Sequence, residues 1–223
     1  MKSKHIALKG RFAPMTDIRD IRPSKVIALG LNYRDHAEEF HMDIPQEPIL
    51  FMKPASAVIY PGDAIVYPAQ ATRVDYEAEL AVVIGERARR VPAARAGDVI
   101  LGYTCLNDVT ERHMQGRDGQ WTRAKGFDTF CPIGPTVATD IDPDDVAVSS
   151  TLNGERKQHS RTGNLIFNVG QIVEFVTSIM TLERGDVIAT GTPSGVGPMQ
   201  PGDEIAVEIE GIGRLVNRVQ AEA

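Results

Sequence analysis

The chain has 223 residues, of which 42% are hydrophobic and 24% are charged. This composition is typical of a folded globular protein and excludes a disordered or fibrous one. With 24 basic and 30 acidic residues the net charge is −6, which argues against nucleic acid or an anionic membrane as a partner. No apolar run approaches the roughly 20 residues of a membrane helix, and no secretory apolar segment follows the basic N-terminus. We therefore expect a cytoplasmic protein with small-molecule partners.

Short apolar runs separated by glycine and proline predict a mostly β chain. The expected strands, in chain order, cover residues 26–30, 49–53, 64–67, 76–84, 99–107, 136–139, 146–152, 186–190, 204–209 and 213–219. Asn153 and Gly154 predict a tight hairpin turn that leads into a polar segment, residues 155–159.

Two segments are predicted to be helical. Residues 168–182 place apolar side chains at helical spacing, and Asn168 with Gln171 resembles a capping box at the start. Residues 32–40 form a shorter and more polar segment. No repeat or linker divides the chain, so we expect one domain.

The segment around residue 77 carries the strongest chemical signal. In an extended strand Asp75, Glu77 and Glu79 share one face. Carboxylates this close favour a divalent cation with oxygen ligands, Mg²⁺ or Mn²⁺ before Zn²⁺, although a solvated acidic edge strand has the same pattern. Asp108, at the end of another predicted strand, is the candidate third ligand, and a turn or cap residue is the alternative.

Three further features are compatible with catalysis or with ordinary structure. His36 and Glu39, one helical turn apart, suit either a general base with its orienting carboxylate or an exposed ion pair. Lys125 lies among small and apolar residues, where a surface lysine is the common case. The glycines and hydroxyls of residues 190–197 could hold an anion, but they match neither a P-loop nor a dinucleotide fingerprint.

Together these segments resemble the fumarylacetoacetate hydrolase family from about residue 22 to the end. The resemblance is carried by residues 32–36, 75–80, 107–108, 125–128 and 191–197, which match in order and spacing. It implies an α+β, predominantly β fold, a mixed β-sandwich roll of the fumarylacetoacetate hydrolase C-terminal domain type with a few short helices. It also implies a homodimer that uses Mg²⁺ or Mn²⁺. We expect residues 1–21 to be a short leader and residues 22–223 the catalytic domain.

By resemblance, the site residues fall into three groups. The metal ligands are Glu77, Glu79 and Asp108. The catalytic residues are His36, Glu39, Lys125 and Gln115. The substrate-binding residues are Thr192, Gly191 and Arg112. The larger members of the family have a long N-terminal domain and a further aspartate where this chain has Leu29, so the resemblance is to the shorter members.

The resemblance implies an enzyme of aromatic-compound catabolism that acts on a small anionic 2-oxo acid. We expect a hydrolase that cleaves a C–C bond of an acylpyruvate-like substrate through a metal-stabilised enolate. The alternative is a decarboxylase or isomerase of a 2-oxo dicarboxylate such as oxaloacetate or 2-hydroxyhepta-2,4-diene-1,7-dioate. A Ca²⁺-stabilised β-sandwich binding module is less favoured. Residues 38–46 are predicted to form a lid over the substrate.

Overall fold

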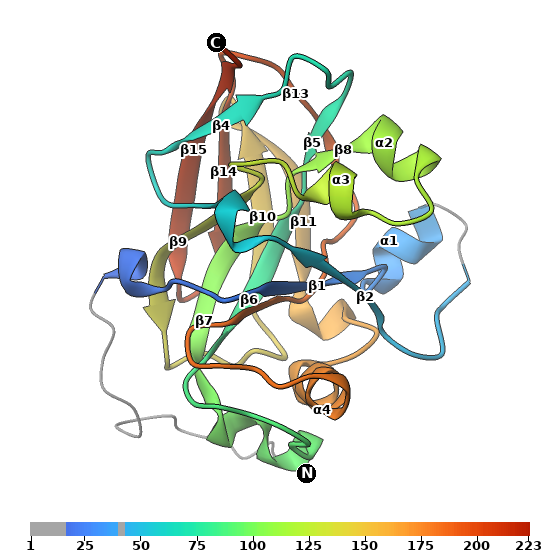
Figure 1. Cartoon of the computed structure of the whole chain (residues 1–223), viewed down its shortest axis with the longest axis vertical. Helices are drawn as coiled ribbons and strands as arrows, with labels where there is room; N and C mark the ends of the chain where they lie inside the picture. Colours follow the sequence, from blue (N-terminus) through green and yellow to red (C-terminus); the bar gives the residue numbers. More distant parts are fainter. Residues whose placement is uncertain (1–16, 40–42) are drawn as a thin grey trace.

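Three β-sheets make up most of the computed structural model, which describes residues 17–39 and 43–223 (Figure 1). A seven-stranded sheet has the order β2 (Ile49–Lys53), β1 (Val26–Gly30), β12 (Val187–Ala189), β6 (Ala78–Ile84), β7 (Ile100–Asn107), β9 (Cys131–Ala138) and β3 (Val58–Ile59). A five-stranded sheet has the order β11 (Glu155–Arg161), β10 (Ala147–Leu152), β14 (Glu204–Ile209), β15 (Gly213–Ala221) and β4 (Ala64–Tyr67). A small sheet joins β13 (Gly197–Met199), β5 (Val74–Tyr76) and β8 (Thr110–Glu111).

The helices are short and lie around the sheets. The α-helices are α1 (Arg34–Glu39), α2 (Arg112–Arg117), α3 (Thr122–Lys125) and α4 (Val169–Ile179). The 3-10 turns are η1 (Ile18–Asp20), η2 (Ala55–Ala57), η3 (Ala93–Asp98) and η4 (Thr162–Asn164). The predicted class, mainly β with a few short helices, is confirmed.

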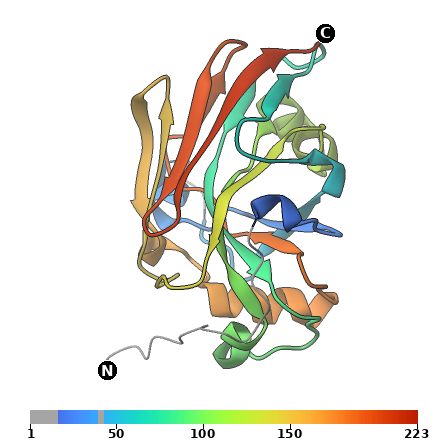
Figure 2. The ribbon, with the colours of Figure 1, turned by 90° about the vertical axis from the view of Figure 1, so that its left-hand side faces the viewer.

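Strand β6 is buried along its whole length because apolar side chains pack against both of its faces. Leu80 and Val82 belong to a cluster that includes residues of α4 and β14. Ala81 and Val83 point the other way, into a cluster with residues of β1 and β9. Figure 2 shows β10 and β11, at one edge of the five-stranded sheet, to the left of β6 and β7. The continuous apolar run of this strand is therefore explained by burial on both faces.

Helix α4 begins where the sequence predicts. The side chain of Asn168 accepts the N–H of Gln171, and the side chain of Gln171 accepts the N–H of Asn168, so the capping box is complete. Ile172, Val173 and Val176 form the buried face, and the helix packs against η3. The helix ends at Ile179, earlier than predicted.

Most predicted strands are confirmed within a few residues, and the differences have local causes. The strand predicted at residues 76–84 divides at Glu77, so β5 and β6 belong to different sheets. Strand β9 begins at Cys131, five residues before the predicted start at residue 136. The short elements α2, α3, β8 and β13 were not predicted, because two to six residues carry too little periodicity to be recognised.

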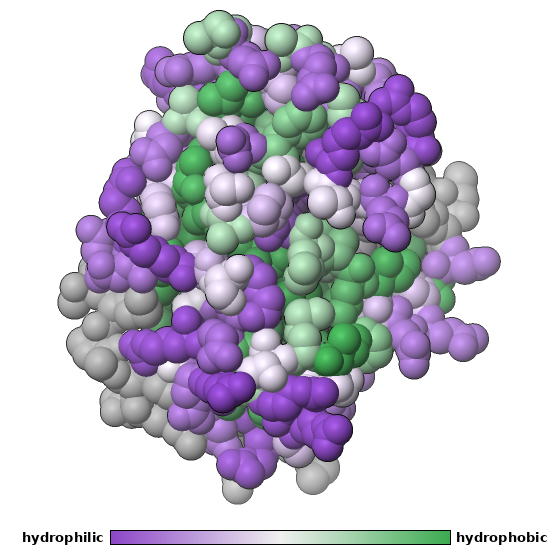
Figure 3. All heavy atoms as spheres, viewed as in Figure 1, coloured by the Kyte–Doolittle hydropathy of each residue, from purple (hydrophilic) through white to green (hydrophobic). Residues whose placement is uncertain are grey.

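The surface in Figure 3 mixes hydrophilic and hydrophobic side chains. Ile49 and Met52, on the edge strand β2, are exposed large apolar residues. No helix within the described residues is long and apolar enough to cross a membrane. The predicted homodimer and the predicted domain boundary at residue 21 stay predictions. Ile18 and Ile21, which precede that boundary or lie at it, are buried in the same apolar cluster as residues of β1.

Candidate metal centre and active site

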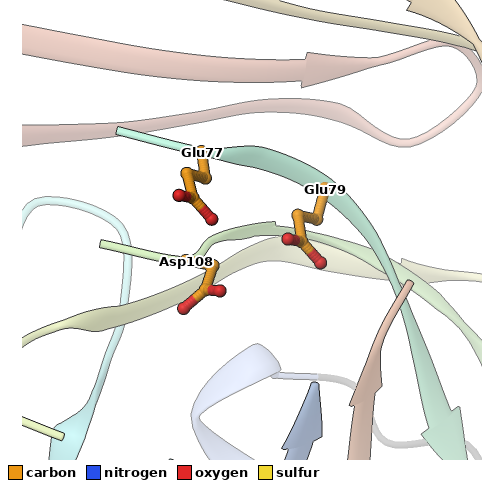
Figure 4. Close-up of side chains that lie close together, drawn as sticks. All are labelled: Glu77, Glu79 and Asp108. Carbon is orange, nitrogen blue, oxygen red and sulfur yellow. The ribbon is translucent and has the colours of Figure 1, made fainter. Parts of the chain in front are cut away.

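Three carboxylates meet at the start of β6 (Figure 4). Glu77 lies between β5 and β6, Glu79 lies on β6, and Asp108 directly follows β7. Their ligand oxygens lie within 4.8 Å of one another, and all three residues are buried. The fold therefore brings the predicted ligands of a divalent cation together.

The pairing of β6 with β7 explains how Asp108 reaches the two glutamates. The strands are antiparallel, with Ala78 opposite Asn107, and the N–H of Asp108 donates to the carbonyl of Glu77 at 2.9 Å. The side-chain Oδ1 of Asn107 accepts the N–H of Glu77 at 2.9 Å. Because this side chain replaces a bond of the strand ladder, the chain can leave the sheet at Glu77 without an unpaired buried N–H.

Two buried lysines contact Asp108, one on each oxygen. Lys53 Nζ lies 2.5 Å from Asp108 Oδ1 and 3.1 Å from the carbonyl of Val109. Lys125 Nζ lies 2.6 Å from Asp108 Oδ2 and 2.7 Å from Glu77 Oε2. Burial by itself lowers the pKa of Lys125, but the charges of Asp108 and Glu77 outweigh it and raise that pKa. Lys125 is therefore a buried ammonium group and not a surface lysine.

Arg112 connects this cluster to a further buried carboxylate. Its Nη2 donates to Glu77 Oε1 at 2.6 Å and its Nε to Asp75 Oδ2 at 2.9 Å. Its Nη1 donates to Gln115 Oε1 at 2.5 Å, which places the predicted catalytic glutamine beside the cluster. Asp75 is also paired with Arg73 at 2.8 Å. Asp75 is thus neutralised by two arginines and lies outside the group of three carboxylates.

The two glutamates of the cluster ionise differently. Burial disfavours the charge of Glu77, but its basic neighbours, Lys125 first, outweigh burial and lower its pKa to about 2. Burial, reinforced by Asp108 and Glu77, raises the pKa of Glu79 well above its ordinary value. The N–H of Gly191, which donates to Glu79 Oε2 at 2.7 Å, only partly offsets this. The protonated form of Glu79 is therefore favoured more than in water, and a cation bound by this carboxylate would compete with the proton.

The hydroxyl of Thr192 is largely engaged by the protein itself. Its Oγ1 donates to the carbonyl of Ala78 at 2.9 Å and accepts from Gln158 Nε2 at 2.8 Å. Gln158 is fully buried, and its Oε1 also accepts the N–H of Ala78 at 3.0 Å. The hydroxyl retains one acceptor lone pair. The side chain of Thr192 can therefore accept a hydrogen bond from a ligand but cannot donate one.

The predicted general-base pair lies on α1, which leaves the seven-stranded sheet after β1. The structure places His36 and Glu39 on this helix, but the side chains of both lie outside the part that the structure describes. Residues 40–42 of the predicted lid also lie outside it. The pairing of His36 with Glu39 and the lid stay predictions.

The donor set fits a cation that prefers oxygen ligands. Three carboxylates are the ligand type that Mg²⁺ and Mn²⁺ select. The hydroxyl of Tyr33, which precedes α1, is buried and, among the described residues, has no hydrogen-bond partner. Burial first, and then the charge of Glu79, raise the pKa of Tyr33.

Lys53 is the charged residue of the cluster that sequence reasoning missed. It is 1% exposed and closes the apolar strand β2 before Pro54. A lysine as the last residue of an apolar strand is the basic counterpart of Asp108, which directly follows β7. That position was a usable signal, but the partner of Lys53 is 55 residues away in the chain.

The comparisons with known proteins identify the family. Residues 25–220 match the family model described as fumarylacetoacetate (FAA) hydrolase C-terminal. The chain belongs to this family. An uncharacterized protein of Methanocaldococcus jannaschii is 54% identical over 216 residues, which cover 97% of this chain and 91% of that protein.

Several members of the fumarylacetoacetate hydrolase family that resemble this chain are named for an activity; one is named a fumarylacetoacetate hydrolase, and others are named isomerases or tautomerases. The crystal structure of 5-carboxymethyl-2-hydroxymuconate delta-isomerase from Mycobacterium smegmatis has 51% identity and a TM-score of 0.86, covering 91% of this chain and 80% of that one. Mitochondrial oxaloacetate tautomerase FAHD2B from Bos taurus is 42% identical over 219 residues, 93% of this chain and 68% of that protein. Both names describe isomerisations, so the comparisons favour the isomerase alternative over the expected hydrolysis.

Proposed function

We propose that this protein is a divalent-metal-dependent isomerase that interconverts the keto and enol forms, or the double-bond isomers, of a 2-oxo dicarboxylate. The observation that carries the proposal is the buried group of Glu77, Glu79 and Asp108 within 4.8 Å of one another. The isomerase and tautomerase names of two relatives support this reaction class.

The charges of the site favour a doubly negative substrate. Three carboxylates face three cations, Lys53, Lys125 and Arg112. A divalent cation held by the carboxylates would act as a Lewis acid on the carboxylate and 2-oxo oxygens of the substrate and lower the energy of its enolate form. With that cation present, the site carries about two positive charges, which a dicarboxylate would balance.

The side chains around the carboxylate cluster indicate how a substrate would bind. Arg112 and Lys125 have the charge to hold an anionic oxygen, and Gln115 is held beside them. Thr192 can only accept with its hydroxyl, so it suits the O–H of an enol better than a ketone oxygen. An acceptor placed for the enol would lower the energy of the hydroxy form relative to the keto form.

Isomerisation requires one proton to leave carbon and one to reach oxygen or another carbon. We assign the removal of the carbon proton to His36, with Glu39 as its orienting carboxylate, because imidazole titrates near neutral pH. Hydrolysis of an acylpyruvate would use the same residues and would additionally require a water molecule. The observation that supports hydrolysis as the second candidate function is the description of the matching family as a hydrolase.

The test supplies the protein and Mg²⁺ with oxaloacetate, 5-carboxymethyl-2-hydroxymuconate and acetylpyruvate in parallel. An isomerase changes the enol absorbance of a dicarboxylate while releasing neither CO₂ nor pyruvate. Release of pyruvate and acetate from acetylpyruvate would establish the hydrolase instead. Glu77→Gln is the control for the metal site. An absence of Mg²⁺-dependent conversion of all three compounds would refute both candidates.

Once an active substrate is known, His36→Ala separates the role of the base from that of the metal site. General-base catalysis typically contributes about 10²–10⁴-fold, so we expect kcat to fall by that amount. The binding of Mn²⁺ should be unchanged, because His36 is not among the ligands. Wild-type turnover by the variant would remove His36 from the mechanism.

A further inference from the structure

Asn32 lies between β1 and α1 and uses both ends of its side chain to hold other segments. Its Oδ1 accepts the N–H of Phe167 at 2.9 Å, and its Nδ2 donates to the carbonyl of Phe167 at 3.1 Å. The same Nδ2 donates to the carbonyl of Thr190 at 2.7 Å. The residue is 1% exposed. These partners determine the orientation of the side-chain amide, because only its NH₂ group can donate to two carbonyls.

The bond to Thr190 leads directly to the carboxylate cluster. The carbonyl of Thr190 and the N–H of Gly191 belong to one peptide unit, which is planar, so they point in opposite directions. Asn32 holds the carbonyl, and the N–H donates to Glu79 Oε2 at 2.7 Å. A rotation of this peptide would therefore turn the N–H away from Glu79.

Gly191 shows how closely Asn32 fits this peptide. Gly191 has φ +101°, and a Cβ at this position would lie 2.8 Å from the Cβ of Asn32. Only glycine combines this backbone conformation with such a close approach. Thr190 is fixed from the other side, because its N–H and hydroxyl both donate to the carbonyl of Leu80.

We propose that Asn32 is a positioning residue for Glu79, which it orients through the peptide bond between Thr190 and Gly191, and that it thereby sets the affinity of the carboxylate cluster for a divalent cation. This inference rests on the metal site of the proposed function. Asn32 lies in the connection between β1 and α1, the helix that carries His36 (Figure 1). One side chain in this connection is thus linked through a peptide bond to Glu79, one of the three carboxylates in Figure 4.

The test is Asn32→Asp, which keeps the shape of the side chain but removes both donated hydrogen bonds. Asn217→Asp is the matched control. Asn217 is 2% exposed, and its Nδ2 likewise donates to two carbonyls, those of Tyr60 and Asp63, at 2.9 Å each. Neither of these partners belongs to the cluster. The readout is the dissociation constant of Mn²⁺, measured by electron paramagnetic resonance of the free ion, on each purified variant.

We expect Asn32→Asp to weaken Mn²⁺ binding about 10- to 100-fold, the usual effect of losing a partner of a metal ligand, and Asn217→Asp to stay within about twofold of wild type. A new carboxylate near the site would attract the cation directly, so its direct interaction with the cation predicts a gain of affinity and not a loss. Both variants lose two buried hydrogen bonds and can lose folding stability for that reason. Comparison with Asn217→Asp therefore separates this general loss from an effect on Mn²⁺ binding.

Two results would overturn the proposal. The first is Mn²⁺ binding by a folded Asn32→Asp within about twofold of wild type. The second applies if Asn32→Asp does not fold: the neutral Asn32→Ser then takes its place, and a failure of both to fold would show that Asn32 serves the fold and not the ligand. If the wild-type protein itself binds no Mn²⁺, the metal site of the proposed function fails first.

Discussion

Lys53 and Lys125 each contact one carboxylate oxygen of Asp108. This arrangement predicts how the loss of one lysine changes the stability of the protein. Breaking a buried ion pair on one side typically costs about 3–5 kcal/mol. We therefore expect Lys53→Met to lower the free energy of unfolding by that amount in EDTA, as measured by urea denaturation. Mg²⁺ should restore part of the loss, because a bound cation again neutralises Asp108.

The control for this prediction is Lys25→Met. Lys25 Nζ lies 2.6 Å from Asp186, in a pair that shares no residue with the cluster. Its loss should destabilise the protein less, because Lys25 is 22% exposed and Asp186 keeps other hydrogen-bond donors. Mg²⁺ should not change the free energy of unfolding that is lost in Lys25→Met. Equal Mg²⁺ responses of the two variants would contradict the assignment of Lys53 to the metal site.

The raised pKa of Glu79 predicts how cation binding depends on pH. Burial and the charges of Asp108 and Glu77 raise the pKa of this carboxyl well above its ordinary value. A cation must displace the proton, so Mn²⁺ affinity should rise with pH and level off once the pH exceeds the raised pKa of Glu79. Calorimetry in buffers of different ionisation enthalpy should detect the released proton. An affinity independent of pH between about 5 and 8 would contradict this.

The same pKa shift fixes the sign of the stability change in the absence of a cation. A carboxyl that is harder to ionise in the folded state binds more protons when folded than when unfolded. The free energy of unfolding in EDTA should therefore fall as the pH rises above the ordinary pKa of a glutamate. The opposite sign applies to Glu77, whose pKa is lowered to about 2 and whose stabilisation is lost only in acid.

At the level of secondary structure, the break at Glu77 separates two strands that pair in different sheets. Strand β6 continues as a buried strand of the central sheet, whereas β5 pairs with β8 and β13. The junction is stabilised by Asn107, which supplies the acceptor that a sheet neighbour would otherwise supply. The proposed ligands thus lie at or next to the ends of buried strands, positions that hold side chains more precisely than a loop does.

Helix α4 offers a prediction about local stability. Asn168→Ala removes the acceptor for the N–H of Gln171, and loss of an N-cap typically costs about 1 kcal/mol. We expect a lower melting temperature with unchanged Mn²⁺ binding, because α4 contributes no ligand. Ser178→Ala, an exposed change at the other end of the helix, is the control and should not destabilise. An equal loss of stability in both variants would show that the capping box contributes nothing.

For the molecule as a whole, the position of the cluster predicts that a cation stabilises the entire fold. The proposed ligands lie at β6 and β7, which belong to the seven-stranded sheet, so they converge only in the folded chain. A ligand at 100 times its dissociation constant adds about 2.7 kcal/mol to the free energy of unfolding. Mg²⁺ should therefore raise the melting temperature of the wild type and not that of Glu77→Gln. Identical melting with Mg²⁺ and with EDTA would contradict the site.

The sequence by itself predicted the features that depend on neighbours along the chain. Alternation in a strand places Glu77 and Glu79 on one face, and helical spacing with a capping box locates α4. The order and spacing of the family motifs indicated the fold, which the comparisons then confirmed. The reaction was less well predicted: the sequence favoured hydrolysis, whereas more of the similar proteins are named isomerases or tautomerases than hydrolases.

Only the tertiary structure decided which distant residues surround the carboxylates. Antiparallel pairing of β6 with β7 brings Asp108 to Glu77, and Lys53 reaches Asp108 across 55 residues of chain. Asn32 reaches Thr190 across 158 residues. These contacts depend on strand order and register, which local propensity and spacing do not encode. The burial of Lys125 follows in the same way, because its two carboxylate partners come from other parts of the chain.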